Sequence, residues 1–256
     1  SENIASREYV YRQYDHQVQT NTVIPPGGDA SLIRIKGTKK ALAASTDGNS
    51  RISYLDPYIG AQIAVAEACR NISCTGAEPI ALTNCLNFGN PQKPEVYYQL
   101  DKCVSGISDM SLQFNAPVIS GNVSLYNETQ VSAIFPTPVI GAVGLLQNVE
   151  NHCQSAFKNE NDLVFLLGTN QIDLSLEYFA GSEFLELIHN KIEGAPEIDV
   201  NLEVILQKTC RELISLNLLN SCHDCSEGGL AIAIAESAIL GNKGFIANFE
   251  LNERWD

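Results

Sequence analysis

The chain has 256 residues, 45% of them hydrophobic, and its 30 acidic and 16 basic side chains give a net charge of −14. The hydrophobic fraction predicts a packed core. The acidic balance argues against nucleic acid or an anionic membrane surface as a partner, because both bind basic faces. With no long apolar run and no signal-peptide pattern, we expect a cytoplasmic protein. An anionic ligand would need metal ions or a local basic patch to offset the repulsion from the chain's net negative charge.

The eight cysteines are scattered along the chain, and several lie inside apolar runs. We interpret them as small buried residues rather than a disulfide framework. The pair Cys222-x-x-Cys225 is similar to half of a zinc site or to a redox motif. No second pair matches it, so the sequence does not favour zinc.

In chain order, residues 1–30 form a polar segment that ends in a Pro- and Gly-rich turn, and an amino-terminal domain spans residues 31–148. Its patterns predict strands at 31–36, 41–46, 79–86, 117–120 and 131–146, and helices at 59–74 and 94–114. Strands mixed with two helices of this length indicate an α+β fold, a mixed sheet with helices on one face.

A polar stretch at residues 147–161 is expected to link the first domain to a second, partial α/β domain at 149–256. Its patterns predict strands at 162–168, around Leu218 and at 244–251, and helices at 200–216 and 228–240. Because the chain stops directly after the last strand, we expect this domain to be incomplete.

The helix at 59–74 carries two different faces. An apolar face with helical spacing is expected in the core and comprises Val65, Ala68, Cys69 and Ile72. On the other side, Glu67 and Asn71 are four residues apart and present oxygen atoms side by side, as a hard cation such as Mg²⁺ requires. The alternative is an exposed face with a Glu67–Arg70 surface pair.

A second polar segment follows the strand near residue 118. Gly121 would let a ligand approach the backbone, and Asn122, Ser124 and Asn127 could hold phosphate or a polar substrate. The alternative is a plain hairpin turn, because Gly-Asn is a favoured turn pair.

A third segment, residues 221–230, places acidic side chains before two glycines that open an apolar helix. Asp224 and Glu227 could bind a metal that bridges to a phosphate at the helix N-terminus. They could equally cap the helix.

Two weaker signals remain. Asp47, after a strand, is either a further metal ligand or part of a β-turn. His16 beside Asp15 is either an oriented base or a solvated side chain. The chain contains no lysine-bearing phosphate loop and no G-x-G-x-x-G motif, so ATP would have to be handled through acidic residues and metal.

Several blocks of this sequence resemble the second repeat of the synthetase subunit of the phosphoribosylformylglycinamidine synthases. The most specific are Thr83 to Pro91 (TNCLNFGNP) and Ser120 to Asn127 (SGNVSLYN). The others are residues 14–22, 55–58, 66–71, 75–79, 136–139 and 223–229. The match extends from about residue 10 to residue 240.

The resemblance implies an aminoimidazole ribonucleotide synthetase-like unit of two domains, whose amino-terminal domains pair into a barrel-like sheet. It implies an ATP-dependent ligase: ATP phosphorylates the amide oxygen of formylglycinamide ribonucleotide, and ammonia from a glutaminase partner displaces the phosphate. A chain with one repeat lacks the first repeat as a partner. We therefore expect it to be inactive alone and to form a homodimer.

The resemblance also implies residue roles. Asn84, where the family pattern carries Asp, and Gly121 would contact ATP. Asn122 would bind Mg²⁺, and Ser124 would touch the ribonucleotide. These residues belong to a catalytic site that the first repeat completes.

Glu67, Asn71 and Asp224, with Asp47, would instead form a second site that holds ATP or ADP with Mg²⁺ without turnover. His16 is the equivalent of one catalytic histidine of the first repeat, whereas the other falls on Asn49. Three alternatives remain: a nucleotide-binding regulatory or structural module, another ATP-dependent enzyme of the same superfamily, and a purely structural fragment that binds nothing.

Overall fold

A computed structural model describes residues 4–168 and 179–247 of the chain. Its centre is a mixed sheet of six strands in the order β1-β2-β3-β6-β4-β5. The strands are β1 (Thr22–Ile24), β2 (Ser31–Arg34), β3 (Ala41–Asp47), β4 (Glu78–Asn87), β5 (Val118–Ser124) and β6 (Thr137–Leu146). Neighbouring strands run antiparallel except β4 and β5, which are parallel.

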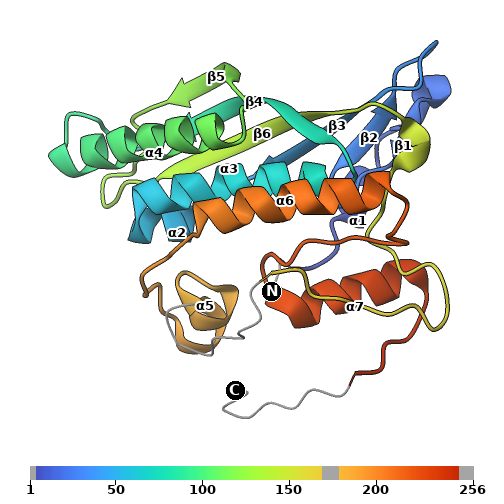
Figure 1. Cartoon of the computed structure of the whole chain (residues 1–256). Coiled ribbons are helices and arrows are strands. Elements are labelled where there is room, and N and C mark those ends of the chain that lie inside the picture. Colours follow the sequence, from blue (N-terminus) through green and yellow to red (C-terminus); the bar gives the residue numbers. More distant parts are fainter. Residues whose placement is uncertain (1–3, 169–178, 248–256) are drawn as a thin grey trace.

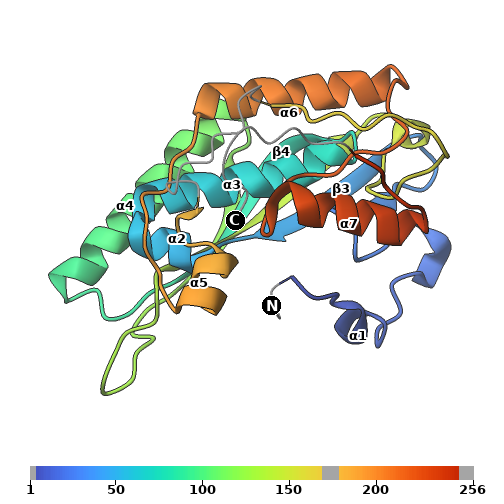
Figure 2. The same cartoon turned by 90° about the horizontal axis from the view of Figure 1, so that it is seen from below.

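Helices cover one face of this sheet (Figure 1). The α-helices are α1 (Glu8–Tyr11), α2 (Ser50–Leu55), α3 (Pro57–Cys74), α4 (Pro94–Gln113), α5 (Glu183–His189), α6 (Val200–Ser215) and α7 (Gly229–Gly241). Short 3₁₀ turns lie at Val18–Thr20 and Val149–Asn151. Helix α3 packs on β3, β4 and β6, and both α4 and α6 pack on α3. Seen from below the sheet, α6 runs alongside α3, against which it packs (Figure 2).

The start of α3 follows from its sequence. The Asp56 carboxylate accepts hydrogen bonds from the backbone N–H groups of Tyr58 and Ile59, at 2.9 and 3.0 Å, and Pro57 occupies the first turn, where its missing N–H is not needed. The apolar face expected in the core is buried at all four positions, so that prediction is confirmed.

Helix α6 is fixed to α3 by a buried polar side chain. Gln207 is 2% exposed, and its Nε2 donates to the carbonyl of Ala66 at 2.8 Å. The Ser73 hydroxyl in turn donates to Gln207 Oε1 at 3.2 Å. A satisfied buried amide specifies one alignment of the two helices, because sliding would leave its polar atoms unpaired.

No helix among those described packs on the other face of the sheet, and that face is apolar. Ile33 pairs across the strands with Leu42, and Leu42 pairs with Leu145. Ile33 is 48% exposed and Leu42 is 40% exposed. A contiguous exposed apolar patch of this kind marks an interaction surface in soluble proteins.

The predicted amino-terminal elements are confirmed, except that β5 runs four residues further than expected and residues 131–136 of the strand expected at 131–146 form no strand. Helix α1 and strand β1, in the segment at 1–30, were not predicted. The carboxyl-terminal strands are less well predicted. Residues 162–168 and the segment around Leu218 form no strand, and residues 248–251 of the last expected strand lie outside the described residues. Leu163 and Phe165 are 80% and 82% exposed, because no described strand pairs with this apolar run. Helices α2 and α5 were not predicted. Among the described helices, none is long and apolar enough to cross a bilayer.

Candidate functional site

Three distant parts of the chain bring acidic side chains together below the sheet. We call Asp47, Glu67, Asn71 and Asp224 the acidic cluster. Asp47 ends β3, Glu67 and Asn71 lie one turn apart on α3, and Asp224 precedes α7. Asn71 Nδ2 donates a hydrogen bond to Asp47 Oδ2 at 3.2 Å. All four residues were singled out from the sequence, and the fold places them in one region.

Arg70 does not form the expected surface pair with Glu67. Its Nε lies 2.8 Å from Glu203 Oε1 on α6, and its Nη1 lies 3.5 Å from Asp224 Oδ2. The surface-pair interpretation is therefore wrong, because α6 and the loop before α7 cover this side of α3. Burial lowers the pKa of Arg70, but the charge and hydrogen bond of Glu203, together with the charges of Asp224 and Glu67, outweigh it and raise the pKa above its ordinary value.

The carboxyl groups of the acidic cluster have raised pKa values. Burial, reinforced by the charge of Asp47, raises the pKa of Glu67 to about 8. Burial and the charge of Asp224 raise the pKa of Asp47 to about 6, and burial with the charge of Asp29 raises that of Asp224 to about 6. Carboxylates that repel one another away from water are the environment that a divalent cation stabilises, and Mg²⁺ takes oxygen ligands of this kind.

Glu227 borders the acidic cluster and is held by two partners. Arg51 Nη2 lies 3.0 Å from Glu227 Oε1, and Asn49 Nδ2 donates to the same oxygen at 2.7 Å. Arg51 also pairs with Glu183 and Glu186 of α5, at 2.5 and 2.8 Å. Asn49, where the resemblance places a lost histidine, caps α2 through its side-chain oxygen.

The start of α7 shows that the capping alternative for Asp224 and Glu227 is wrong. Neither Asp224 nor Glu227 caps this helix, since its N-cap residue is Gly228 and no side chain bonds to its first turn. Gly228 and Gly229 both have positive φ values, +90° and +63°. A side chain at Gly228 would also collide with Ile232. The two glycines are therefore needed for the backbone path that places Asp224 beside α3.

A second group of the predicted residues lies on the edge of the sheet. In the parallel pair of β4 and β5, Asn84 lies opposite Gly121, Cys85 opposite Asn122 and Asn87 opposite Ser124. Gly121 and Asn122 are inside a continuous strand, so the hairpin alternative is wrong. A Cβ at Gly121 would collide with the Asn84 side-chain oxygen. A larger residue at position 121 would therefore displace the Asn84 side chain.

The end of β5 is held in place by Asn127. Its Nδ2 donates to the carbonyl of Ser124 at 2.9 Å and to that of Phe88 at 3.1 Å. It also donates to the Ser124 hydroxyl oxygen at 3.1 Å, and because Phe88 is fully buried, these bonds tie the Ser124 hydroxyl to the core. Ser124 is thereby positioned at the rim of the sheet, half-buried.

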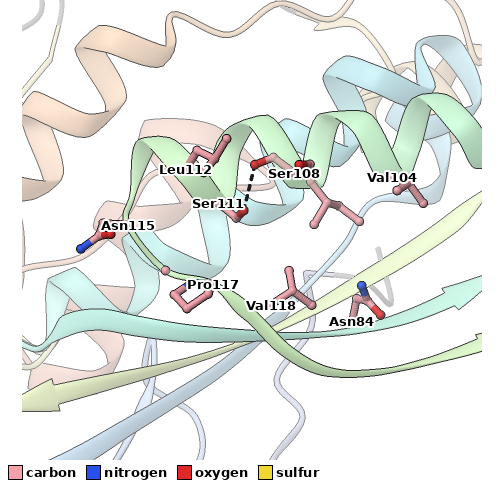
Figure 3. A pocket seen from close by; sticks show the side chains of 10 residues that line it. Asn84, Val104, Ser108, Ser111, Leu112, Asn115, Pro117 and Val118 are labelled. Atoms are coloured by element: carbon pink, nitrogen blue, oxygen red, sulfur yellow. Dashed lines mark hydrogen bonds between the residues drawn. The ribbon is translucent and has the colours of Figure 1, made fainter.

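A hollow of about 430 Å³ opens between α4 and the edge strand (Figure 3). Asn84 lines it on one side, with Val104 and Ser108 of α4 and Val118 of β5 among the other residues. None of its lining side chains is charged. The hollow alone therefore has nothing to balance a phosphate, and only Asn84 connects it with the predicted site residues.

His16 belongs to neither group. Its Nδ1 lies 3.1 Å from the carbonyl of Tyr14, while Asp15 accepts a hydrogen bond from the Gln17 backbone instead of orienting the imidazole. Among the described residues, no hydrogen bond or ion pair joins His16 to the acidic cluster or to the strand edge, so the structure gives no support to a base at this position.

Sequence reasoning overlooked Arg51 and the α6 residues Glu203 and Gln207 around the acidic cluster. Arg51 gives no motif, because its three carboxylate partners come from two separate later segments. Glu203 and Gln207 did give a signal, since they are four apart on one helix, as Glu67 and Asn71 are. Glu203 Oε1 accepts from Gln207 Nε2 at 2.8 Å and thereby links the Arg70 ion pair to the helix interface.

Comparison with known families identifies the class to which this fold and these sites belong. The model described as "AIR synthase related protein, N-terminal domain" matches residues 27–146. The model described as "AIR synthase related protein, C-terminal domain" matches residues 159–254. Together the two cover most of the chain, so the chain belongs to the AIR synthase related proteins.

Within this class, the chain is similar to one kind of subunit. It is 51% identical over 255 residues to phosphoribosylformylglycinamidine synthase subunit PurL of Caldanaerobacter subterraneus subsp. tengcongensis. It is 51% identical over 243 residues to the PurL subunit of Moorella thermoacetica. These matches include 99% and 94% of this chain but 34% and 32% of the relatives. The chain thus spans about a third of the length of the curated relatives it matches.

Solved structures agree with this. The structure of PurLQS from Thermotoga maritima has a TM-score of 0.59 and 36% identity, and covers 66% of this chain and 28% of that chain. T. maritima PurL complexed with FGAR has a TM-score of 0.59 and 27% identity, and covers 83% and 30%. AaThiL complexed with AMPPCP and TMP, 16% identical with a TM-score of 0.51, shares the fold. The family resemblance and the α+β fold are confirmed.

Proposed function

We propose that the chain is part of an ATP-dependent synthetase that converts formylglycinamide ribonucleotide to its amidine in purine biosynthesis. The observation that carries the proposal is the 51% identity to a PurL subunit over 99% of the chain. Solved T. maritima PurL structures contain ATP, ADP or FGAR, which supports a nucleotide and a ribonucleotide as ligands. The ammonia would come from a glutaminase partner.

The edge of β4 and β5 supplies this chain's share of the catalytic site. Asn84 and Gly121 would contact ATP, and Ser124 would hold the ribonucleotide through the hydroxyl that Asn127 positions. Asn122 offers an amide oxygen to Mg²⁺, which would neutralise charge on the phosphates when bound. The exposed edge strand leaves these groups open to another domain, in keeping with a site that the first repeat completes.

The chemistry needs two displacements. The amide oxygen of the substrate attacks the γ-phosphorus of ATP, and ADP leaves. Ammonia then attacks the activated carbon, and inorganic phosphate leaves with the former amide oxygen. Positioning and charge stabilisation are the protein's contribution to both steps, and Ser124 and Asn84 would provide positioning from this chain.

The acidic cluster would hold a second nucleotide without turnover. Asp47, Glu67 and Asp224 offer carboxylate oxygens and Asn71 an amide oxygen, a donor set that fits Mg²⁺ bound to ADP or ATP. The raised carboxyl pKa values support the presence of a cation there, because an Mg²⁺ ion would offset the mutual repulsion. Asn49 occupies the position of the second histidine, in keeping with a site that holds nucleotide without turnover.

The open apolar face of the sheet would take the partner domain. In the parent enzyme we assign it to the first repeat of the same subunit, and in the isolated chain to a second copy. Ile33, Leu42 and Leu145 form the centre of this surface. A barrel-like pairing of two such sheets would bury them.

The proposal is tested by transplanting the chain into the PurL subunit of C. subterraneus in place of the matching third. We expect the chimera to support ATP- and ammonia-dependent amidine formation, and Asn122→Ala to reduce kcat/KM by at least tenfold. The chain alone should give no turnover. A folded chimera that gives no activity, or turnover by the isolated chain, would contradict the proposal.

A second function is favoured by the acidic cluster itself, whose four residues all lie in this chain. As a nucleotide-binding structural or regulatory module, the isolated chain would bind Mg-ADP without any other subunit. The chimera distinguishes the two, because a module of this kind would bind nucleotide yet fail to restore amidine formation.

A further inference from the structure

Three cysteine thiols lie close together between α3, α6 and the segment before α7. Cys74 ends α3, Cys210 lies on α6, and Cys222 lies in the segment before α7. Their sulfur atoms all lie within 4.8 Å of one another, and Cys210 Sγ is 3.3 Å from Cys222 Sγ. We call these residues the thiol cluster. We propose that the thiol cluster binds a thiophilic metal ion, Zn²⁺, that joins α3, α6 and the segment before α7.

The sulfur spacing suits such an ion. Zinc–thiolate bonds are about 2.3 Å long and tetrahedral, so two ligating sulfurs lie about 3.8 Å apart. The observed distances, from 3.3 Å to within 4.8 Å, bracket this value. Shifts of less than about 1 Å would therefore place all three sulfurs at bonding distance, leaving one tetrahedral position for a further ligand.

The backbone around the thiol cluster is fixed before any ion binds. The Cys153 N–H donates to the Thr75 carbonyl at 3.2 Å, and the Cys222 N–H donates to the Gln154 carbonyl at 3.0 Å. The stretch at 153–154 therefore bridges the segments that carry Cys74 and Cys222. A site held this way loses little conformational entropy on binding.

The surroundings match a thiolate site as well. Ile214 and Leu219 pack around Cys210, so the sulfurs are shielded on that side, while Cys222 remains half-buried and gives an ion access. Arg211, next to Cys210, donates from Nη1 to Ser73 Oγ at 2.8 Å. Its positive charge would offset the net negative charge of three thiolates on a divalent ion.

Buried cysteines elsewhere in the chain form the contrast. Cys69 and Cys103 are fully buried and behave as small apolar residues. Hydrophobic packing alone gives no reason for three sulfurs from three elements to meet. The sequence pair Cys222-x-x-Cys225 is misleading, because Cys225 is exposed and lies outside the cluster.

The test uses the full 256-residue chain, reduced and freed of metal by a chelator that is then removed. Zn²⁺ alone is added, and bound zinc is measured by mass spectrometry of the metal after gel filtration. Co²⁺ serves as a second probe, since thiolate ligation produces a sulfur-to-cobalt charge-transfer band. We expect a single bound ion per chain, a cobalt band and protection of three thiols from N-ethylmaleimide.

Variants locate the ion. Cys210→Ser and Cys222→Ser should each lower zinc affinity at least tenfold and remove the cobalt band. The matched controls Cys225→Ser and Cys103→Ser should bind as the unaltered chain does. Glu67→Gln should leave the cobalt band unchanged, which separates this site from the acidic cluster. Circular dichroism checks that each variant is folded.

Two results would overturn the proposal. One is a folded, reduced chain without a cobalt–thiolate band, or with a band that survives Cys210→Ser. The other is a reduced chain that, left in air with Zn²⁺, loses two hydrogens to oxygen and forms a Cys210–Cys222 disulfide instead of retaining zinc. Neither result bears on amidine synthesis, so failure here is distinguishable from failure of the proposed function.

Discussion

At the scale of single residues, Glu67 shows how position decides chemistry. On an isolated helix it would be an ordinary surface carboxylate. The fold buries it beside Asp47, and burial together with that charge raises its pKa to about 8. A carboxyl group with a strongly raised pKa is typical of sites that bind a cation or transfer protons. The other oxygen-bearing side chains around Glu67 favour a cation site.

The raised pKa predicts how stability depends on pH in chelator, with no divalent cation present. The folded pKa of Glu67 lies above the unfolded value near 4.5, so its favourable contribution is complete below about pH 4.5 and is lost as the pH rises through 8. Because glutamine does not ionise, Glu67→Gln removes this pH-dependent loss of stability. We expect the variant to be more stable than the unaltered chain by about 1–3 kcal/mol at pH 8 and nearly equal at pH 5.

Urea unfolding at the two pH values measures this difference. Glu212→Gln on the exposed side of α6 is the control and should change little at either pH. A Glu67→Gln variant that is less stable than the unaltered chain at pH 8 would show that the carboxylate is ionised and favourably paired in the metal-free protein.

Gly121 carries a second prediction at this scale. Because a Cβ at this position collides with the Asn84 side-chain oxygen, Gly121→Ala must displace Asn84. In the chimeric synthetase we expect KM for ATP to rise at least tenfold while the melting temperature falls by only a few degrees. An unchanged KM would remove Asn84 and Gly121 from the ATP site. Gly244→Ala, where an added Cβ would meet nothing within 4 Å, is the control for stability.

At the scale of elements, α3 is the centre of the fold, since it contacts the sheet, α4 and α6. Its start depends on Asp56, which caps two backbone N–H groups. We expect Asp56→Ala to lower the free energy of unfolding by about 1 kcal/mol. Denaturant unfolding measures it, with the exposed Asp101→Ala on α4 as the control. Equal effects of the two substitutions would contradict the role of the cap.

The helices and strands also show which parts of the fold the sequence predicts and which it does not. Long helices with a clear apolar stripe, α3 and α4, were predicted to within two residues, because burial of one face dominates their stability. The run at 162–168 was predicted as a strand from its apolar residues alone. A strand requires a partner, and the sequence pattern does not contain that information. The short helices α2 and α5 were missed because their ion pairs through Arg51 connect distant segments.

The same limit applies to the sites. The members of the acidic cluster were found through helical spacing and family resemblance, but Arg70, Glu203 and Arg51 acquired their partners only through tertiary packing. The thiol cluster gave a misleading signal, since Cys222 meets Cys74 and Cys210 rather than its sequence neighbour Cys225. Contacts between residues more than a hundred positions apart leave no periodic trace in one sequence.

At the scale of the whole molecule, the sheet has one covered and one open face. The open face predicts self-association of the isolated chain. We expect a dimer in sedimentation equilibrium, and Leu42→Glu should shift the population to monomer because it places a charge among apolar side chains. Ile205→Glu, on the exposed side of α6, should leave the dimer intact. A monomer at high concentration would contradict the assignment of this face.

The most direct test of the account is calorimetric titration of ADP into the isolated chain, with Mg²⁺ and with chelator. If the acidic cluster is a nucleotide site, binding requires Mg²⁺, weakens at least tenfold in Glu67→Gln and is unchanged in Glu212→Gln. Magnesium-independent binding, equal binding by Glu67→Gln, or no binding by a folded chain would contradict the assignment of the acidic cluster as a nucleotide site.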